Sequence, residues 1–202
     1  MDLWKFGLEV FISLLVIIDP PGNAPIFLAI VSDRTQAVRN RLALQAVLVA
    51  FGIITLFALA GQFVLSYLGI SLAAMQASGG LLLLLVSLQL LTGNSDGTEQ
   101  PVTNTNVALV PLGTPLLAGP GAIVATIVFV KRVDNLSMAA VLALAIVAVH
   151  IVMWIVLRSS TAVVKILKES GVTLIARIAG LLLAAIAVQM VADAVRAFIQ
   201  AS

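Results

Sequence analysis

The heptapeptide DPPGNAP (residues 19–25) lies inside the apolar segment 10–32, in which Asp19 is the only charged residue. In a helix interior, proline costs about 3 kcal/mol and glycine about 1 kcal/mol relative to alanine. A carboxylate at the centre of a membrane span costs about 2.5–3.5 kcal/mol more. A regular helix cannot run through such a stretch, so the heptapeptide predicts a break within the segment.

The composition of the chain indicates an integral membrane protein. Of its 202 residues, 61% are hydrophobic and 10% are charged, and the mean hydropathy is +1.18. Soluble domains carry about 25% charged residues. Cysteine is absent, which excludes disulfides and thiolate metal sites. The net charge of +2 comes from basic residues in short loops, and we expect no nucleic-acid partner.

Six apolar segments are long enough to cross the hydrocarbon core of a bilayer, which takes about 20 residues of helix. They are 10–32, 42–68, 70–92, 107–130, 136–157 and 178–199. Residues 93–106 form the polar loop between the third and fourth segments. The stretch STAVVKILKES (160–170) predicts a short interfacial helix with Lys165 and Lys168 on its wet side. The sequence therefore predicts a single all-α transmembrane domain, 1–202, surrounded by lipid.

The chain repeats itself after about a hundred residues. GLLLLLVSLQLL (80–91) aligns with GLLLAAIAVQMV (180–191), with a glycine and a glutamine at equivalent places. Pro21-Gly22 likewise aligns with Pro120-Gly121, and six of the seven prolines lie in two clusters, 20–25 and 111–120. We therefore expect two repeats, 1–92 and 107–202, of three segments each. Three crossings reverse direction, so the repeats are inverted, as in many secondary transporters.

The topology leaves two alternatives open for the first and fourth segments. Each is either a span broken at its Pro/Gly motif or a re-entrant hairpin. In both cases seven of the eleven Lys and Arg residues fall on one side of the membrane. The excess of positive charge in cytoplasmic loops then places both termini outside the cytoplasm.

The two breaks are where a ligand site is expected. Asp19-Pro20 and Gly119-Pro120 both read as an N-cap followed by proline at the first helical position. Half-helices that begin there would aim unpaired N–H groups and positive dipole ends at the membrane midplane, where they attract anions. Asp19 could pair with an amine, a cation or a proton. Amides beside one carboxylate suit a zwitterion such as a small amino acid.

The predicted substrate site gathers the polar and backbone-bending residues of both motifs and one glutamine from each repeat. Its members are Asp19, Gly22, Asn23, Pro25, Gln89, Thr114, Gly119, Pro120, Gly121 and Gln189. For several of them a structural role is the alternative. Asp19 is then only a helix cap, Asn23 bonds its own turn, and Gln89 and Gln189 bond between helices.

Two other polar groups have simpler expected roles. His150 is favoured as a neutral, hydrogen-bonded side chain over a proton relay. Asp193 stands three residues before Arg196 near a helix end, which favours a surface ion pair.

Three motifs give the chain a resemblance to a known family. Asp-Pro-x-Gly-Asn-x-Pro-Ile-Phe (19–27), Pro-Leu-x-x-Pro-Leu-x-x-Gly-Pro-Gly (111–121) and Gln189-Met190 before Asp193 resemble the MarC family over essentially the whole chain. The resemblance implies a six-span protein of the bacterial or archaeal inner membrane with periplasmic termini. It also implies kinship with the LysE-type transporter group, and some members are described as transporters of small neutral amino acids such as glycine and alanine.

The function expected from these features is secondary transport of a small neutral solute, by alternating access around a midplane site. The alternative is a channel or a structural membrane protein with partners. One histidine, no cysteine and no acid pair argue against an enzyme, and the sequence has no nucleotide-binding loop. No cofactor is expected, coupling to H⁺ or Na⁺ is open, and so is assembly into a homo-oligomer.

Overall fold

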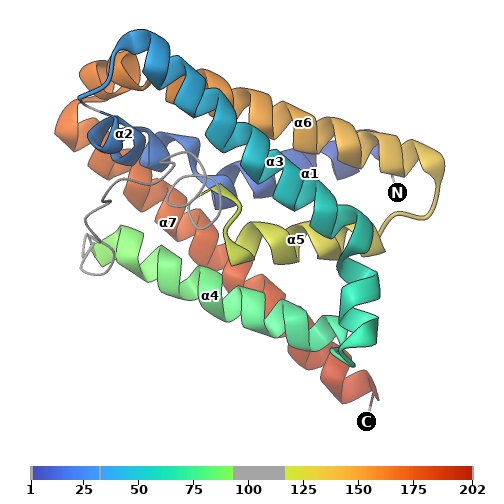
Figure 1. Ribbon diagram of the computed structural model, residues 1–202. Helices are drawn as coiled ribbons and strands as arrows, with labels where there is room; N and C mark the ends of the chain where they lie inside the picture. Colours follow the sequence, from blue (N-terminus) through green and yellow to red (C-terminus); the bar gives the residue numbers. More distant parts are fainter. Residues whose placement is uncertain (1, 32, 93–116, 202) are drawn as a thin grey trace.

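The computed structural model describes residues 2–31, 33–92 and 117–201. This part of the chain is helical, with no strand among the described residues (Figure 1). The helices are α1 (Leu3–Ile18), α2 (Pro20–Ile30), α3 (Gln36–Tyr67), α4 (Leu72–Thr92), α5 (Pro120–Lys131), α6 (Leu136–Arg158) and α7 (Ser160–Ala201).

Five helical stretches, of which the first covers both α1 and α2, are long and apolar enough to cross a membrane. They are Leu3–Leu28, Gln36–Tyr67, Leu72–Thr92, Leu136–Arg158 and Ser170–Gln200. The all-helical membrane class is thereby confirmed. The predicted fourth segment is described only from residue 117 onwards, where α5 has 12 residues and is too short to span alone. The predictions for 93–116, Thr114 included, fall outside the described residues.

The backbone is interrupted at the predicted first break and at one position that was not predicted as a break. α1 ends at Ile18 and α2 begins at Pro20, and between them Asp19 has the left-handed conformation φ 46°, ψ 66°. Lys168 has φ 54°, ψ 177° inside α7, which separates the beginning of α7 from the membrane stretch that starts at Ser170. Lys165 and Lys168 are exposed, as the predicted interfacial segment requires.

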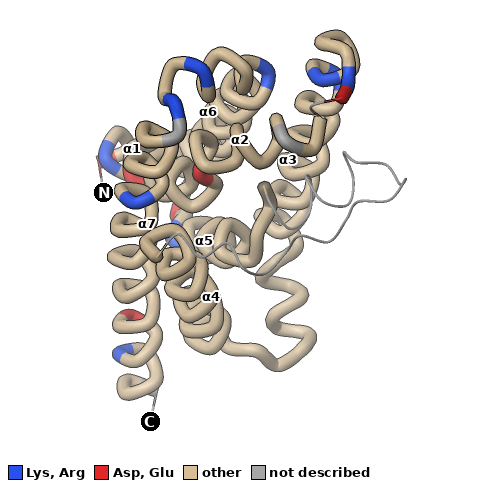
Figure 2. The backbone as a smooth tube through the Cα atoms, turned by 90° about the vertical axis from the view of Figure 1, so that its left-hand side faces the viewer, with Lys and Arg blue, Asp and Glu red and all other residues tan. Residues whose placement is uncertain are grey.

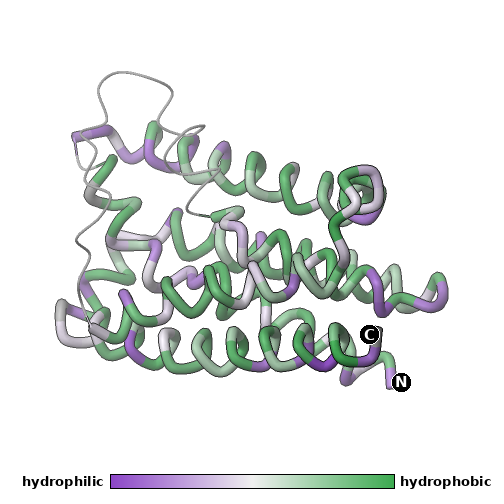
Figure 3. Tube along the Cα trace, turned by 90° about the horizontal axis from the view of Figure 1, so that it is seen from below, coloured by the Kyte–Doolittle hydropathy of each residue, from purple (hydrophilic) through white to green (hydrophobic). Residues whose placement is uncertain are grey.

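The helices pack largely in antiparallel pairs. α4 lies along α7, α3 lies along α6, and each pair runs in opposite directions (Figure 1). α5 packs against α3 and α4, and α1 packs against α6. The charged residues are few and gather mostly at turns and helix ends (Figure 2), while apolar residues predominate along the helices (Figure 3).

Many large apolar side chains are exposed on the outer surface of the bundle. Leu59, Leu136 and Phe63 have 83%, 86% and 74% of their surface exposed. A soluble protein rarely exposes large contiguous apolar patches. This surface therefore fits a lipid environment, in agreement with the composition.

The contact between α4 and α7 is close because each helix places a glycine in it. A Cβ added at Gly80 would lie 2.8 Å from the carbonyl oxygen of Ala187, and one added at Gly180 would lie 3.1 Å from that of Ser87. Small residues let membrane helices approach closely. The two contacts are reciprocal: adding 100 to the number of Gly80 gives Gly180, and subtracting 100 from that of Ala187 gives Ser87.

Candidate functional site

Asp19 closes one helix and caps the next. Its backbone N–H donates to the Leu15 carbonyl at 3.0 Å, and its own carbonyl accepts from the Asn23 N–H at 3.1 Å. Its carboxylate accepts from the Gly22 N–H at 3.2 Å. A left-handed conformation is uncommon outside glycine, although aspartate tolerates it better than most residues. The capping alternative for Asp19 is therefore realised in this structure, with the side chain part-buried.

Gly22 leaves room for this cap. A Cβ at position 22 would overlap the Asp19 carboxylate, because it would lie only 2.8 Å from Asp19 Cγ. The absence of a side chain lets the carboxylate lie directly over the first turn of α2. Gly22 therefore belongs to the break because it makes room for an acid.

Asn23 satisfies part of the broken backbone. It is buried, and its side-chain amide donates to the Ile18 carbonyl at 2.6 Å and to the Asp19 carbonyl at 3.1 Å. The local turn hydrogen bond considered for Asn23 is thus present. Its amide nitrogen ties the end of α1 to the first turn of α2.

The prolines leave carbonyl oxygens without helical partners. Pro20 and Pro21 have no N–H to donate to the carbonyls of Val16 and Ile17, and Pro25 has none for the carbonyl of Pro21. The C-terminal end of α1 also carries the negative end of its helix dipole. With the Asp19 carboxylate added, the break offers an oxygen-rich environment that favours a cation, an ammonium group or a proton.

The second motif begins α5 in a different way. Gly119 is the N-cap, with no side-chain cap hydrogen bond, and its carbonyl accepts from Ala122 and Ile123 at 3.0 and 3.2 Å. A Cβ at Gly121 would run into the Leu83 side chain of α4, so this glycine serves helix packing. The acid of the first motif has no counterpart here, since the equivalent Ala118 is apolar and buried.

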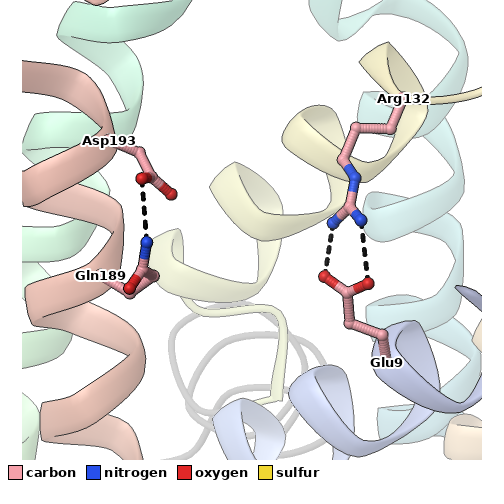
Figure 4. A network of polar contacts seen from close by, with 4 residues as sticks. All are labelled: Glu9, Arg132, Gln189 and Asp193. Atoms are coloured by element: carbon pink, nitrogen blue, oxygen red, sulfur yellow. Dashed lines mark hydrogen bonds and ion pairs between the residues drawn. The ribbon is translucent and has the colours of Figure 1, made fainter. Parts of the chain in front are cut away.

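The structure brings the flanks of the two breaks into one core. Ile18, which precedes the first break, shares a buried cluster with Leu117, Ala118 and Ala122 around the second. Neither glutamine is placed at this core: both side chains are exposed. Gln189 donates to Asp193 at 2.9 Å on its own helix rather than to another helix (Figure 4).

An ion pair that the sequence did not reveal joins α1 to the end of α5. Both terminal guanidinium nitrogens of Arg132 donate to the Glu9 carboxylate, at 2.5 and 2.8 Å (Figure 4). The guanidinium also lies 5.7 Å from the Phe6 ring centroid and 5.5 Å from that of Phe129. Hydrogen bonding to Glu9 raises the pKa of Arg132. The only sequence signal was an acid directly before one apolar segment and a base shortly after another.

The two remaining polar groups make the contacts expected of them. His150 is buried, and its Nδ1 lies 2.7 Å from the Ile146 carbonyl, which requires a proton on Nδ1. Arg196 pairs with Asp193 at 3.6 Å on the exposed side of α7. Among the residues described, His, Asp and Glu form no group of three or more that could hold a metal ion.

These features define a polytopic α-helical membrane protein with a carboxylate at a helix break inside a candidate span. The model of the MarC family of integral membrane proteins matches residues 4–199, and the chain belongs to that family.

Curated relatives match over nearly their full length. A UPF0056 membrane protein of Methanocaldococcus jannaschii is 35% identical, over 97% of this chain and 98% of its own. One from Aquifex aeolicus is 33% identical, over 95% and 94%. The Escherichia coli UPF0056 membrane protein YhcE is 30% identical, over 93% and 91%. The matches span bacteria and archaea, and no solved structure matches the chain.

Proposed function

We infer that this protein is a secondary transporter for a small neutral zwitterion, most simply glycine or alanine. The observation that carries the proposal is Asp19, a part-buried carboxylate held at a helix break within the candidate span Leu3–Leu28. An acid inside a membrane span is costly and usually functional. Transport, rather than catalysis, suits a site with one acid and no described catalytic group beside it.

The two breaks supply complementary halves of a zwitterion site. The Asp19 carboxylate and the carbonyls released by Pro20 and Pro21 would receive the ammonium group. The first turn of α5 has no side-chain cap among the described residues. It would direct its amides and positive dipole end toward the carboxylate of the zwitterion. Pro25, Gly119 and Pro120 complete the described part of the proposed site, with a proton or Na⁺ as the coupling ion.

The packing of the helices supports an inverted repeat of three plus three segments. The reciprocal Gly80 and Gly180 contacts are what a two-fold relation between the halves requires, because an isologous contact repeats itself with the partners exchanged. The antiparallel course of α3 and α6 is also consistent with it. Alternating access would then be a rocking of one repeat against the other, with both termini outside the cytoplasm.

Uptake by proteoliposomes tests the proposal. The purified protein should show saturable exchange of radiolabelled glycine or alanine that unlabelled solute competes away. Asp19→Asn removes the charge but keeps an oxygen to cap Gly22, so we expect at least tenfold slower exchange in a protein that remains folded. Asp193→Asn, which alters an exposed acid on α7, is the matched control and should leave exchange unchanged.

The result that contradicts the assignment is specific. Unchanged exchange in Asp19→Asn would remove Asp19 from the mechanism. Flux that rises linearly with solute concentration would indicate a channel instead. No flux of any amino acid in a folded protein would favour a structural role.

A further inference from the structure

A groove runs along the outer contact between α3 and α6. It holds a cavity of about 420 Å³ and a second of about 230 Å³, which adjoin because Phe51 and Val147 line both. Its lining on α6 extends from Ala139 to Trp154. At 1.5 Å per residue this is about 22 Å, more than half the thickness of the hydrocarbon core.

The groove opens on the apolar surface of the bundle. Leu48, Val147 and Ile151 line it and keep 57%, 40% and 50% of their surface exposed. Nearly all of the lining is aliphatic or aromatic. An extended hydrocarbon chain is therefore the chemistry that fits its length and walls.

One end of the groove is cationic. Leu44 and Trp154 line the smaller cavity from the two antiparallel helices, and Arg41 and Arg158 lie one turn beyond them toward the same end. Both arginines are exposed, and the Arg158 guanidinium lies 5.2 Å from the Trp154 ring centroid. No described acid pairs with either of them. Basic pockets between transmembrane helices bind the head groups of anionic lipids.

A polar atom near this end also lacks a partner. The indole Nε1–H of Trp154 is buried, and no described group accepts from it. Trp154 lies one helical turn deeper than Arg158. If the arginines hold a lipid phosphate, an ester carbonyl of the same lipid lies at about the depth of the indole N–H. Tryptophan is enriched at this level of a membrane.

We propose that the α3–α6 groove binds an anionic phospholipid, with one acyl chain along Phe51 and Val147 and the phosphate at Arg41 and Arg158. The occupant comes from the membrane leaflet at the basic end of the bundle. This site is separate from the Asp19 break, so lipid binding here does not depend on solute transport.

Fluorescence of Trp154 provides a direct readout, because the chain has two tryptophans and Trp4→Phe leaves only Trp154. In this background the protein is titrated with phosphatidylglycerol or phosphatidylcholine carrying identical brominated acyl chains. We expect phosphatidylglycerol to quench at a lower mole fraction. About 1 kcal/mol for each basic residue near a membrane surface corresponds to about fivefold for each arginine.

Variants separate the head-group contact from the chain contact. Arg41→Gln with Arg158→Gln should abolish the preference for phosphatidylglycerol, whereas Lys165→Gln, an exposed lysine of α7, should retain it. Val147→Trp fills the groove and should weaken binding of unbrominated phosphatidylglycerol in a competition assay on the purified protein. The control for Val147→Trp is Leu144→Trp, because Leu144 is exposed on α6 but does not line the groove.

Three outcomes would overturn the proposal. Equal quenching by the two lipids would exclude recognition of the anionic head group. A preference that survives removal of both arginines would place the anion elsewhere. A dimer that Val147→Trp converts to a monomer in light scattering would make the groove an interface between two copies of the chain.

Discussion

The carboxylate of Asp19 accepts a hydrogen bond from the backbone N–H of Gly22 at 3.2 Å, in a space that any larger residue at position 22 would occupy. The acid and the glycine form one unit. The heptapeptide that interrupts the first membrane segment therefore forms a helix cap, and the carboxylate that caps α2 is the one proposed to bind the solute.

Gly22→Ala should destabilise the protein, because the new methyl group overlaps the carboxylate and breaks the cap. Loss of an N-cap costs about 0.5–2 kcal/mol, and we expect a cost of this order in unfolding by denaturant in detergent. In an Asp19→Ala background the overlap disappears, and Gly22→Ala should then cost much less. Equal costs in the two backgrounds would show that the cap does not depend on the glycine.

Asn23→Ala should also be destabilising, by about 1–3 kcal/mol, because the Ile18 and Asp19 carbonyls lose the buried amide that satisfies them. Asn23→Asp should not rescue the loss, since an ionised carboxylate has no N–H to donate. Asn40→Ala removes an exposed side-chain hydrogen bond with Gln36 in α3 and should shift the unfolding midpoint only slightly. A midpoint for Asn23→Ala within that small shift would contradict the structural role.

The Glu9–Arg132 pair should contribute a measurable but modest coupling energy. Both side chains are partly exposed, which limits such pairs to about 1 kcal/mol even with two-point geometry. A double-mutant cycle with Glu9→Gln and Arg132→Gln, read out by unfolding, measures this coupling free of other effects. The Asp193–Arg196 pair, which is more exposed and lies within one helix, is the comparison and should show less. Coupling no larger than in that pair would mean that Glu9 does not tie α1 to α5.

The local chemistry of proline and glycine explains why the break could be predicted from the sequence. Proline removes a hydrogen bond wherever it stands, so the interruption at Asp19-Pro20 needed no tertiary information. Five of the six spans were predictable for a similar reason, because the length of an apolar run is read directly from the order of residues. The partner of Glu9 was not predictable, since Arg132 lies 123 residues away.

The orientation of side chains around the helices was the other part that the sequence could not supply. Gln89 and Gln189 occupy equivalent places in the two predicted repeats, yet both are exposed, because helix packing decides the rotation of α4 and α7. Gly22 and Gly121 align as well, but one accommodates a carboxylate and the other the Leu83 side chain. Equivalent positions in a repeat need not perform the same task.

The reciprocal contact between α4 and α7 leads to a paired prediction. Gly80→Ala and Gly180→Ala each place a methyl group against a backbone carbonyl that cannot rotate away, at 2.8 and 3.1 Å. We expect each to destabilise by about 1–3 kcal/mol, the usual effect of overpacking, with Gly80→Ala the more severe. Gly52→Ala is the control, because nothing lies within 4 Å of its added Cβ, and it should be neutral or stabilising.

The double variant tests whether the two glycines serve a single contact. Once the first methyl group has separated α4 from α7, the second should find room, so Gly80→Ala with Gly180→Ala should cost less than the sum of the single changes. Unfolding midpoints of the four proteins in the same detergent measure this difference. If the cost of the double variant equals the sum of the single costs, the two glycines act independently. That result would weaken the case for a two-fold relation between the halves.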